Sequence, residues 1–142
     1  MKNAEKIQRR ISLSGYDMET ADAMLQTKRY LYVGFMYYQV VKNFFKACYV
    51  KLKEDTPPYT HNLEYLALKN GFYEILSEKQ QDFILELNPL NTEVRYSKYK
   101  FLTCRCVPLQ RTGCQKKRLQ ILISSFWQQL KNNKINLYIN TI

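Results

Sequence analysis

Four polar residues recur along one long and otherwise apolar stretch of the chain, and their spacing could form an anion site. Gln39, Lys42, Asn43 and Lys46 stand at i, i+3, i+4 and i+7, which places them on one face of a helix. Two lysines one turn apart suit a phosphate or a polynucleotide. The alternative is a solvated face on which the lysine stems cover apolar neighbours. This polar stripe therefore predicts either an anion-binding surface or an ordinary solvent-exposed face.

His61, the single histidine of the chain, follows a proline-rich turn. We expect it just inside the start of a helix, where an imidazole could take part in acid–base chemistry or fix the turn by a hydrogen bond. One histidine beside scattered cysteines does not supply the three or four ligands that zinc requires. We therefore expect no metal site and no cofactor.

Arg95 and Tyr96 form a third candidate, because an arginine next to an aromatic ring suits a phosphate together with a stacked base. The alternative is that Arg95 ties its loop to a carboxylate such as Glu93 or Glu64. The sequence leaves both interpretations open.

The sequence also indicates a compartment. No apolar run approaches the roughly 20 residues of a membrane span, because Lys42 and Lys46 interrupt the best candidate. The charged N-terminus lacks the apolar stretch of a secretory signal. The four cysteines lack paired CxxC spacing, which favours reduced thiols. We expect a cytoplasmic protein that does not enter a membrane.

The net charge of +10 is unevenly distributed. Residues 1–93 contain 12 basic and 12 acidic side chains, whereas residues 94–142 contain 10 basic side chains and no acidic one. Such a tail could bind RNA or DNA through its phosphates. A change of reading frame in the gene near codon 101, or plain divergence, would also produce this abrupt break.

Apolar periodicity predicts an all-α fold. Residues 3–27 form a first helix that Ser14-Gly15 weakens without ending, and residues 29–53 form a central one. The short Thr27-Lys28 link makes these two pack antiparallel. In the first helix, the apolar side chains should face inward, namely Met18, Ala21, Ala23 and Leu25. The acidic side chains should face mostly outward, namely Asp17, Glu19 and Asp22.

Turn residues divide the rest of the chain. Thr60 is a good N-cap for a third helix that stops at Gly71, and Ser77 opens a fourth with a capping box. A polar loop should follow at residues 91–100. We expect a domain over residues 1–101 and an atypical basic segment over 102–142, with a last helix at 115–131.

Several of these segments together resemble the HEPN domains of bacteria and archaea. The resemblance covers about residues 4–100 and rests on DMETADAML, RYLYVGFMYYQVVKNFFKA, TPPYTHNLEYLA and NTEVRYSKYK. It implies an up-and-down bundle of four to five helices that dimerises. It also implies a common genomic partner, a minimal nucleotidyltransferase, with the pair often acting as toxin and antitoxin. Many members are metal-independent ribonucleases that use an Arg followed four to six residues later by a His.

The chain departs from the family pattern at the residues that matter most. None of residues 54–60 is Arg, so His61 lacks its catalytic partner, and no histidine follows Arg95. Relatives usually carry Glu and Lys where Lys42 and Asn43 stand. These departures favour a protein without a catalytic pair of its own.

The resemblance and the departures together predict a homodimeric binding or regulatory protein. It would pair with a nucleotidyltransferase and contact a nucleotide, an RNA or that partner. The expected contact residues are Gln39, Lys42, Lys46, His61, Arg95 and Tyr96. One alternative is a ribonuclease toxin that uses His61 with an arginine from elsewhere, such as Arg95 across the dimer. Another is a decayed, inactive remnant.

Overall fold

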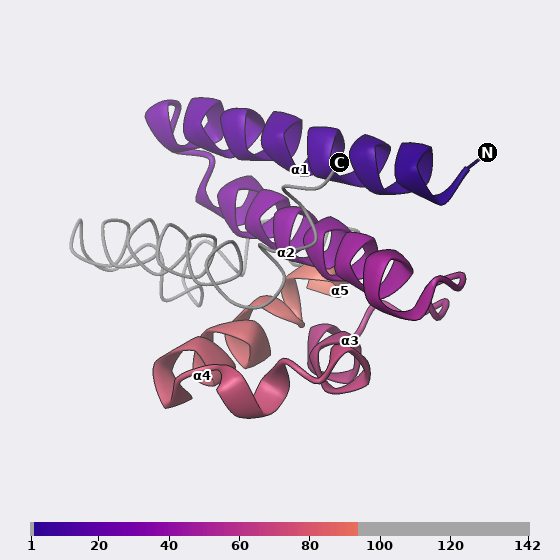
Figure 1. The fold of residues 1–142 in the computed structure, drawn as a ribbon. Coiled ribbons are helices and arrows are strands. Elements are labelled where there is room, and N and C mark those ends of the chain that lie inside the picture. The colour runs from indigo at the N-terminus through magenta and orange to yellow at the C-terminus, as the bar shows by residue number, and fades with distance from the viewer. Residues whose placement is uncertain (1, 94–142) are drawn as a thin grey trace.

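The computed structural model describes residues 2–93, and over that range the chain is helical with no strand (Figure 1). Its elements are α1 (Asn3–Gln26), α2 (Tyr30–Lys53), α3 (Leu63–Asn70), the 3-10 turn η1 (Tyr73–Ile75), α4 (Glu78–Leu87) and α5 (Leu90–Glu93). The all-α bundle that the sequence predicts is confirmed. No helix in this range has the length and apolar character that crossing a membrane requires.

Helices α1 and α2 form a long antiparallel hairpin, as the short link predicts (Figure 1). Lys28 makes the reversal possible with a left-handed φ of 60°. The fully buried Ser14 lies where the helices meet, and its hydroxyl reaches the carbonyl oxygens of Arg10 and Val40 at 3.0 and 3.3 Å. Ser14 and its neighbour Gly15 therefore leave α1 unbroken.

Two of the inward and outward assignments on α1 are wrong. Ala23 is exposed rather than packed inward, and Asp17 is half-buried rather than outward. The periodicity placed Ala23 inward because alanine counts as apolar, yet a single methyl group adds little to a core. Asp17 is drawn inward because polar side chains of α2 lie opposite it.

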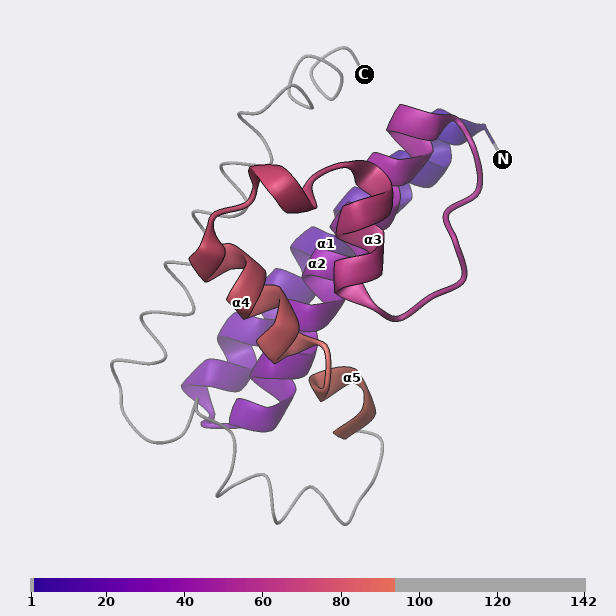
Figure 2. The same cartoon turned by 90° about the horizontal axis from the view of Figure 1, so that it is seen from below.

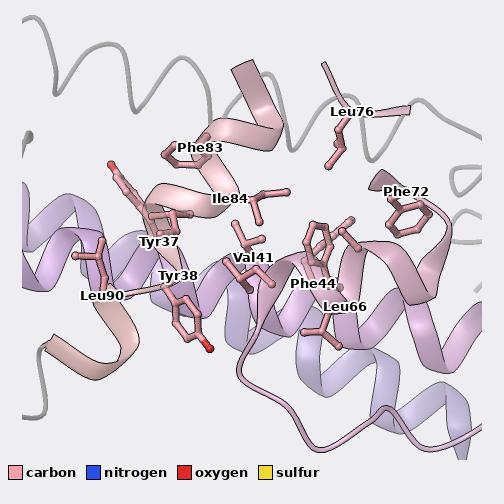
Figure 3. Close-up of a cluster of buried hydrophobic side chains, with 14 of the residues drawn as sticks. Tyr37, Tyr38, Val41, Phe44, Leu66, Phe72, Leu76, Phe83, Ile84 and Leu90 are labelled. Carbon is pink, nitrogen blue, oxygen red and sulfur yellow. The ribbon is translucent and has the colours of Figure 1, made fainter. Parts of the chain in front are cut away.

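Helix α2 is the centre of the bundle, with α1 on one side and α3, α4 and α5 on the other (Figures 1 and 2). Its aromatic side chains make the core, in which Tyr37, Tyr38 and Phe45 are at most 1% exposed. Figure 3 shows residues of the shorter helices packed against these side chains of α2, among them Phe83 and Ile84. The near-continuous apolar character of α2 follows from its contacts on both sides.

Polar side chains cap the starts of α3 and α4. Ser77 and Gln80 form the predicted capping box at the start of α4. The predicted N-cap of α3 is wrong: Asn62 caps the helix by accepting from the Tyr65 amide, and the Thr60 hydroxyl accepts from the Asn62 amide. Both residue types cap well, so the sequence did not separate them. The left-handed Gly71 ends α3 as expected.

The described part of the chain ends with α5. Residues 91–93 are helical, so the predicted loop over 91–100 is wrong at its start. Leu90 and Asn91 are buried, and Leu90 belongs to the core cluster. The predicted boundary at residue 101 and the predicted helix at 115–131 lie outside the described residues.

Two glycines give opposite expectations for stability. Gly15 is an exposed helical residue at which an added Cβ meets nothing within 4 Å, so Gly15→Ala should raise the free energy of unfolding by about 1 kcal/mol. Gly71 has a φ of 75°, so Gly71→Ala should lower it by about 1 kcal/mol. Urea denaturation of both variants measures this, and shifts of the same sign would contradict the assigned backbone.

Candidate functional site

The polar stripe of α2 lies against α1 of the same chain. Gln39, Lys42 and Asn43 are half-buried, and Lys46 is only 9% exposed. The stripe is therefore not a fully solvated surface. It forms one wall of a polar seam between the two long helices.

Asn43 of this seam lies opposite two charged residues of α1, Arg10 and Asp17. Its Oδ1 accepts from Arg10 Nη1 at 3.4 Å, and its side chain also hydrogen-bonds to Asp17. Arg10 and Asp17 stand seven residues apart on α1, which is two helical turns. We call Arg10, Asp17, Lys42, Asn43 and Lys46 the seam.

The seam contains more positive than negative charge, and the pKa values of three of its residues are shifted. Burial, and then repulsion from Arg10, lowers the pKa of Lys46 below its ordinary value. Burial, and then repulsion from Arg9, lowers the pKa of Arg10. Burial raises the pKa of Asp17, although Lys42 and the bond to Asn43 act against that rise. Among residues 2–93, the seam thus gathers three cations around one carboxylate, Asp17.

Lys42 is connected to the loop that carries His61 through one buried ring. The Lys42 ammonium lies 5.7 Å from the centre of the Tyr38 ring, within the range of a cation–π interaction. The Tyr38 hydroxyl donates a short hydrogen bond to the His61 carbonyl oxygen. Tyr38 therefore fixes the position of the loop relative to the seam.

His61 lies just before α3 and not inside it, because Asn62 is the N-cap. Its exposed side chain meets the Tyr59 ring edge-on, with 5.8 Å between ring centres. The structure thus links the backbone of His61 to the seam while its imidazole packs beside Tyr59. Arg95 and Tyr96, the other expected contact residues, lie outside the described residues.

Residues 2–93 contain no group of three His, Cys, Asp or Glu side chains that could hold a metal ion. Cys48 is a free thiol buried in the core, and burial raises its pKa to about 12. A thiol in that state is a packing residue rather than a nucleophile or ligand.

The sequence prediction missed the α1 half of the seam. It found the stripe on α2 from its spacing, and the same test applied to α1 would have found Lys6, Arg9 and Arg10 at i, i+3 and i+4. Their signal was hidden because the acids and bases of residues 1–93 cancel in number. Only the packing shows which of these charges face α2.

Comparison with known families decides what this bundle is. The family model of the HEPN domain matches residues 7–116, which include most of α1, all of α2, the seam and the His61 turn. The chain belongs to the HEPN family. No curated protein and no solved structure gives a significant match.

Asn43 and Lys42 contribute differently to the seam of this HEPN chain. The Asn43 amide oxygen accepts from Arg10 Nη1 at 3.4 Å. Lys42 is a second lysine in the seam, one turn from Lys46.

Lys46→Met should stabilise the unliganded HEPN protein at pH 7 by about 1 kcal/mol, because it removes a buried charge and keeps an unbranched apolar stem. The pKa of Lys46 is lower folded than unfolded, so its charge opposes folding at neutral pH. That cost disappears as the pH rises toward the ordinary lysine value of 10.5, and the advantage of the variant should shrink.

Urea denaturation at a series of pH values measures this difference, with the exposed Lys79→Met as the control. A Lys46→Met protein that is less stable than wild type at pH 7 would show that the ammonium group has a favourable partner.

Proposed function

We propose that this HEPN protein is a binding or regulatory module that holds a nucleotide or an RNA at the seam and has no catalytic pair of its own. The surplus of cations in the seam is the observation that carries the proposal. Arg10 lies close enough to disfavour the charge of Lys46, and Asp17 is the carboxylate that faces Lys42. An anionic ligand would relieve that repulsion.

A phosphate group fits the chemistry of the seam better than a carboxylate does. Arg10 offers a planar fork of donors, and Lys42 and Lys46 offer point charges one turn apart. Partial burial strengthens such contacts because less water competes for the charges. The Tyr38 ring holds the Lys42 ammonium by a cation–π interaction, with 5.7 Å to the ring centre.

The absence of the catalytic pair rests on the sequence around His61. No arginine occurs among residues 54–60, and the imidazole packs against Tyr59. One observation favours the alternative of a ribonuclease toxin: Tyr38 joins the His61 backbone to the surroundings of Lys42. In that case an arginine from elsewhere, such as Arg95 across a dimer, would complete the pair. A decayed remnant, the third reading, would bind no ligand at all.

We further propose a homodimer in the cytoplasm that works with a minimal nucleotidyltransferase in a toxin–antitoxin-like module. Family membership supports this assignment, because the resemblance implies both the dimer and the genomic partner. The cation surplus supports it independently, since either a nucleotide or an acidic partner surface would compensate the charge of the seam. Detection of a small nucleotidyltransferase gene beside this one would identify the module.

Lys42→Ala should weaken binding of single-stranded RNA and lower the salt dependence, with the slope of log K against log salt falling by about 1. Asp17→Asn should strengthen binding, because it removes the internal competitor of the ligand. Fluorescence anisotropy at several salt concentrations measures both, and Lys79→Ala controls for net charge. If Lys42→Ala and Lys79→Ala bind RNA equally well, the seam is not the site.

Purified protein should leave RNA intact in the presence of EDTA, and His61→Ala should change neither that result nor RNA affinity by more than about twofold, a difference within ~0.4 kcal/mol. The physical reason is that His61 lacks an arginine partner within the loop. Gel electrophoresis of a labelled RNA after long incubation is the measurement. Cleavage that His61→Ala abolishes would replace the binding module with the ribonuclease.

A further inference from the structure

The two sides of the bundle carry opposite charge. Residues 2–53, which form the hairpin, contain ten basic and four acidic side chains, whereas residues 54–93 contain two basic and eight acidic ones. The acidic part includes α3 and α4, which lie on the side of α2 away from α1 (Figures 1 and 2). The charges of the described part cancel in number, yet they are separated across α2.

The outward side of α4 carries a row of acids. Its three exposed carboxylates stand at i, i+4 and i+8: Glu78, Asp82 and Glu86. Like charges four residues apart on a helix repel each other. Glu86 also lies in the last turn of α4, where the helix dipole disfavours an anion and no basic residue is present. A cationic group placed beside this row would reverse the sign of both effects.

Exposed apolar side chains lie on the same side of the bundle. Leu85 of α4 is 43% exposed, and Tyr65 and Leu68 of α3 are 40% and 54% exposed. Leu85 stands three residues before Asn88, Tyr65 stands three residues after Asn62, and these two asparagines hydrogen-bond to each other at 3.1 Å. The apolar side chains of the two helices therefore belong to one surface. We call it the outer face, and it consists of Tyr65, Leu68, Glu78, Asp82, Leu85 and Glu86.

Hydrogen bonds within the protein fix the position of α4, which carries most of the outer face. The Gln81 side chain donates to the carbonyl oxygens of Tyr73 and Leu76 at 2.6 and 3.3 Å, which ties α4 to η1. At the other end, Asn88 Oδ1 accepts from the Leu63 amide at 2.8 Å. A partner would therefore meet a surface that is already ordered, and binding would lose less conformational entropy.

The chemistry of the outer face limits what can occupy it. The row of acids repels the phosphates of a nucleic acid. Residues 2–93 contain no group of three His, Cys, Asp or Glu side chains that could hold a metal ion, so these acids do not form a metal site. Apolar side chains flanked by carboxylates complement a protein surface on which apolar side chains are flanked by cations.

We propose that the outer face binds a partner protein through a segment in which leucine-type side chains are flanked by lysine or arginine. The apolar side chains of that segment pack on Leu85, Tyr65 and Leu68, and its cations compensate the row of acids on α4. The proposal goes beyond the proposed function, because the outer face lies across α2 from the seam. A partner protein here and an anion at the seam can be bound at the same time.

Fluorescence anisotropy with a labelled amphipathic peptide of leucine and lysine tests the proposal on the full chain. The peptide should bind saturably, with a dissociation constant on the order of 10 μM, and the same peptide with glutamate in place of each lysine should not bind. Absence of saturable binding would overturn the proposal, whether the outer face is inert or is already covered by residues 94–142 of the chain.

Leu85→Ser and Leu13→Ser form a matched pair, because both leucines are 43% exposed but Leu13 lies on α1. Leu85→Ser should weaken peptide binding about fivefold, or ~1 kcal/mol, because it removes an apolar contact. Leu13→Ser should leave the affinity within about twofold, a difference of ~0.4 kcal/mol. Circular dichroism verifies that both variants fold. Equal effects of the two substitutions would show that the peptide does not bind at the outer face.

A second matched pair tests the charges. Asp82→Asn should weaken peptide binding and make it less dependent on salt, whereas Glu19→Gln, which removes an exposed acid of α1, should do neither. Lys42→Ala should leave peptide affinity within about twofold, ~0.4 kcal/mol, so a failure of the seam as an RNA site would not affect this result. A loss in Glu19→Gln or Lys42→Ala with none in Asp82→Asn would place the peptide elsewhere and refute the outer face.

Discussion

Burial of α2 from both sides is the constraint on which the rest of this HEPN protein depends. The shorter helices meet its aromatic side chains, and Tyr37, Tyr38 and Phe45 lose nearly all contact with water there. On the opposite side, α1 packs against a face of α2 that carries amide and ammonium groups. Lys46 on this face is only 9% exposed. The polar groups on the enclosed faces of α2 are withdrawn from bulk solvent. Each of them therefore either makes a hydrogen bond or has its pKa shifted against its charged form.

That constraint explains the surroundings of the polar side chains in the seam. Asn43 satisfies its amide with Arg10 and Asp17, whereas Lys46 is left with a repulsive neighbour. Arg10 also lines a hollow between α1, the end of α2 and the loop that follows α2. One half-buried guanidinium therefore belongs both to the seam and to this hollow.

Much of the fold was predictable from the sequence, because apolar spacing and capping residues act locally. The antiparallel hairpin, the capping box at Ser77 and the stop at Gly71 all follow from short-range patterns. The errors arose where tertiary contacts decide: Asp17 turned inward to meet Asn43, and Asn62 rather than Thr60 capped α3 because Asn88 lies beside it. The site was half predictable, since spacing found Lys42 and Lys46 but only packing revealed Arg10.

The asparagine contact between α3 and α4 has a consequence for motion. Asn88 accepts from the Leu63 amide at 2.8 Å through Oδ1 and donates to Asn62 Oδ1 at 3.1 Å through Nδ2. Asn88, which directly follows α4, therefore holds the start of α3 by two hydrogen bonds. The start of α3 and the end of α4 cannot fray independently. We therefore expect the Leu63 amide and the end of α4 to exchange hydrogen with solvent through one common opening. The histidine loop, which is tied to that unit and to Tyr38, would open with it as a single body.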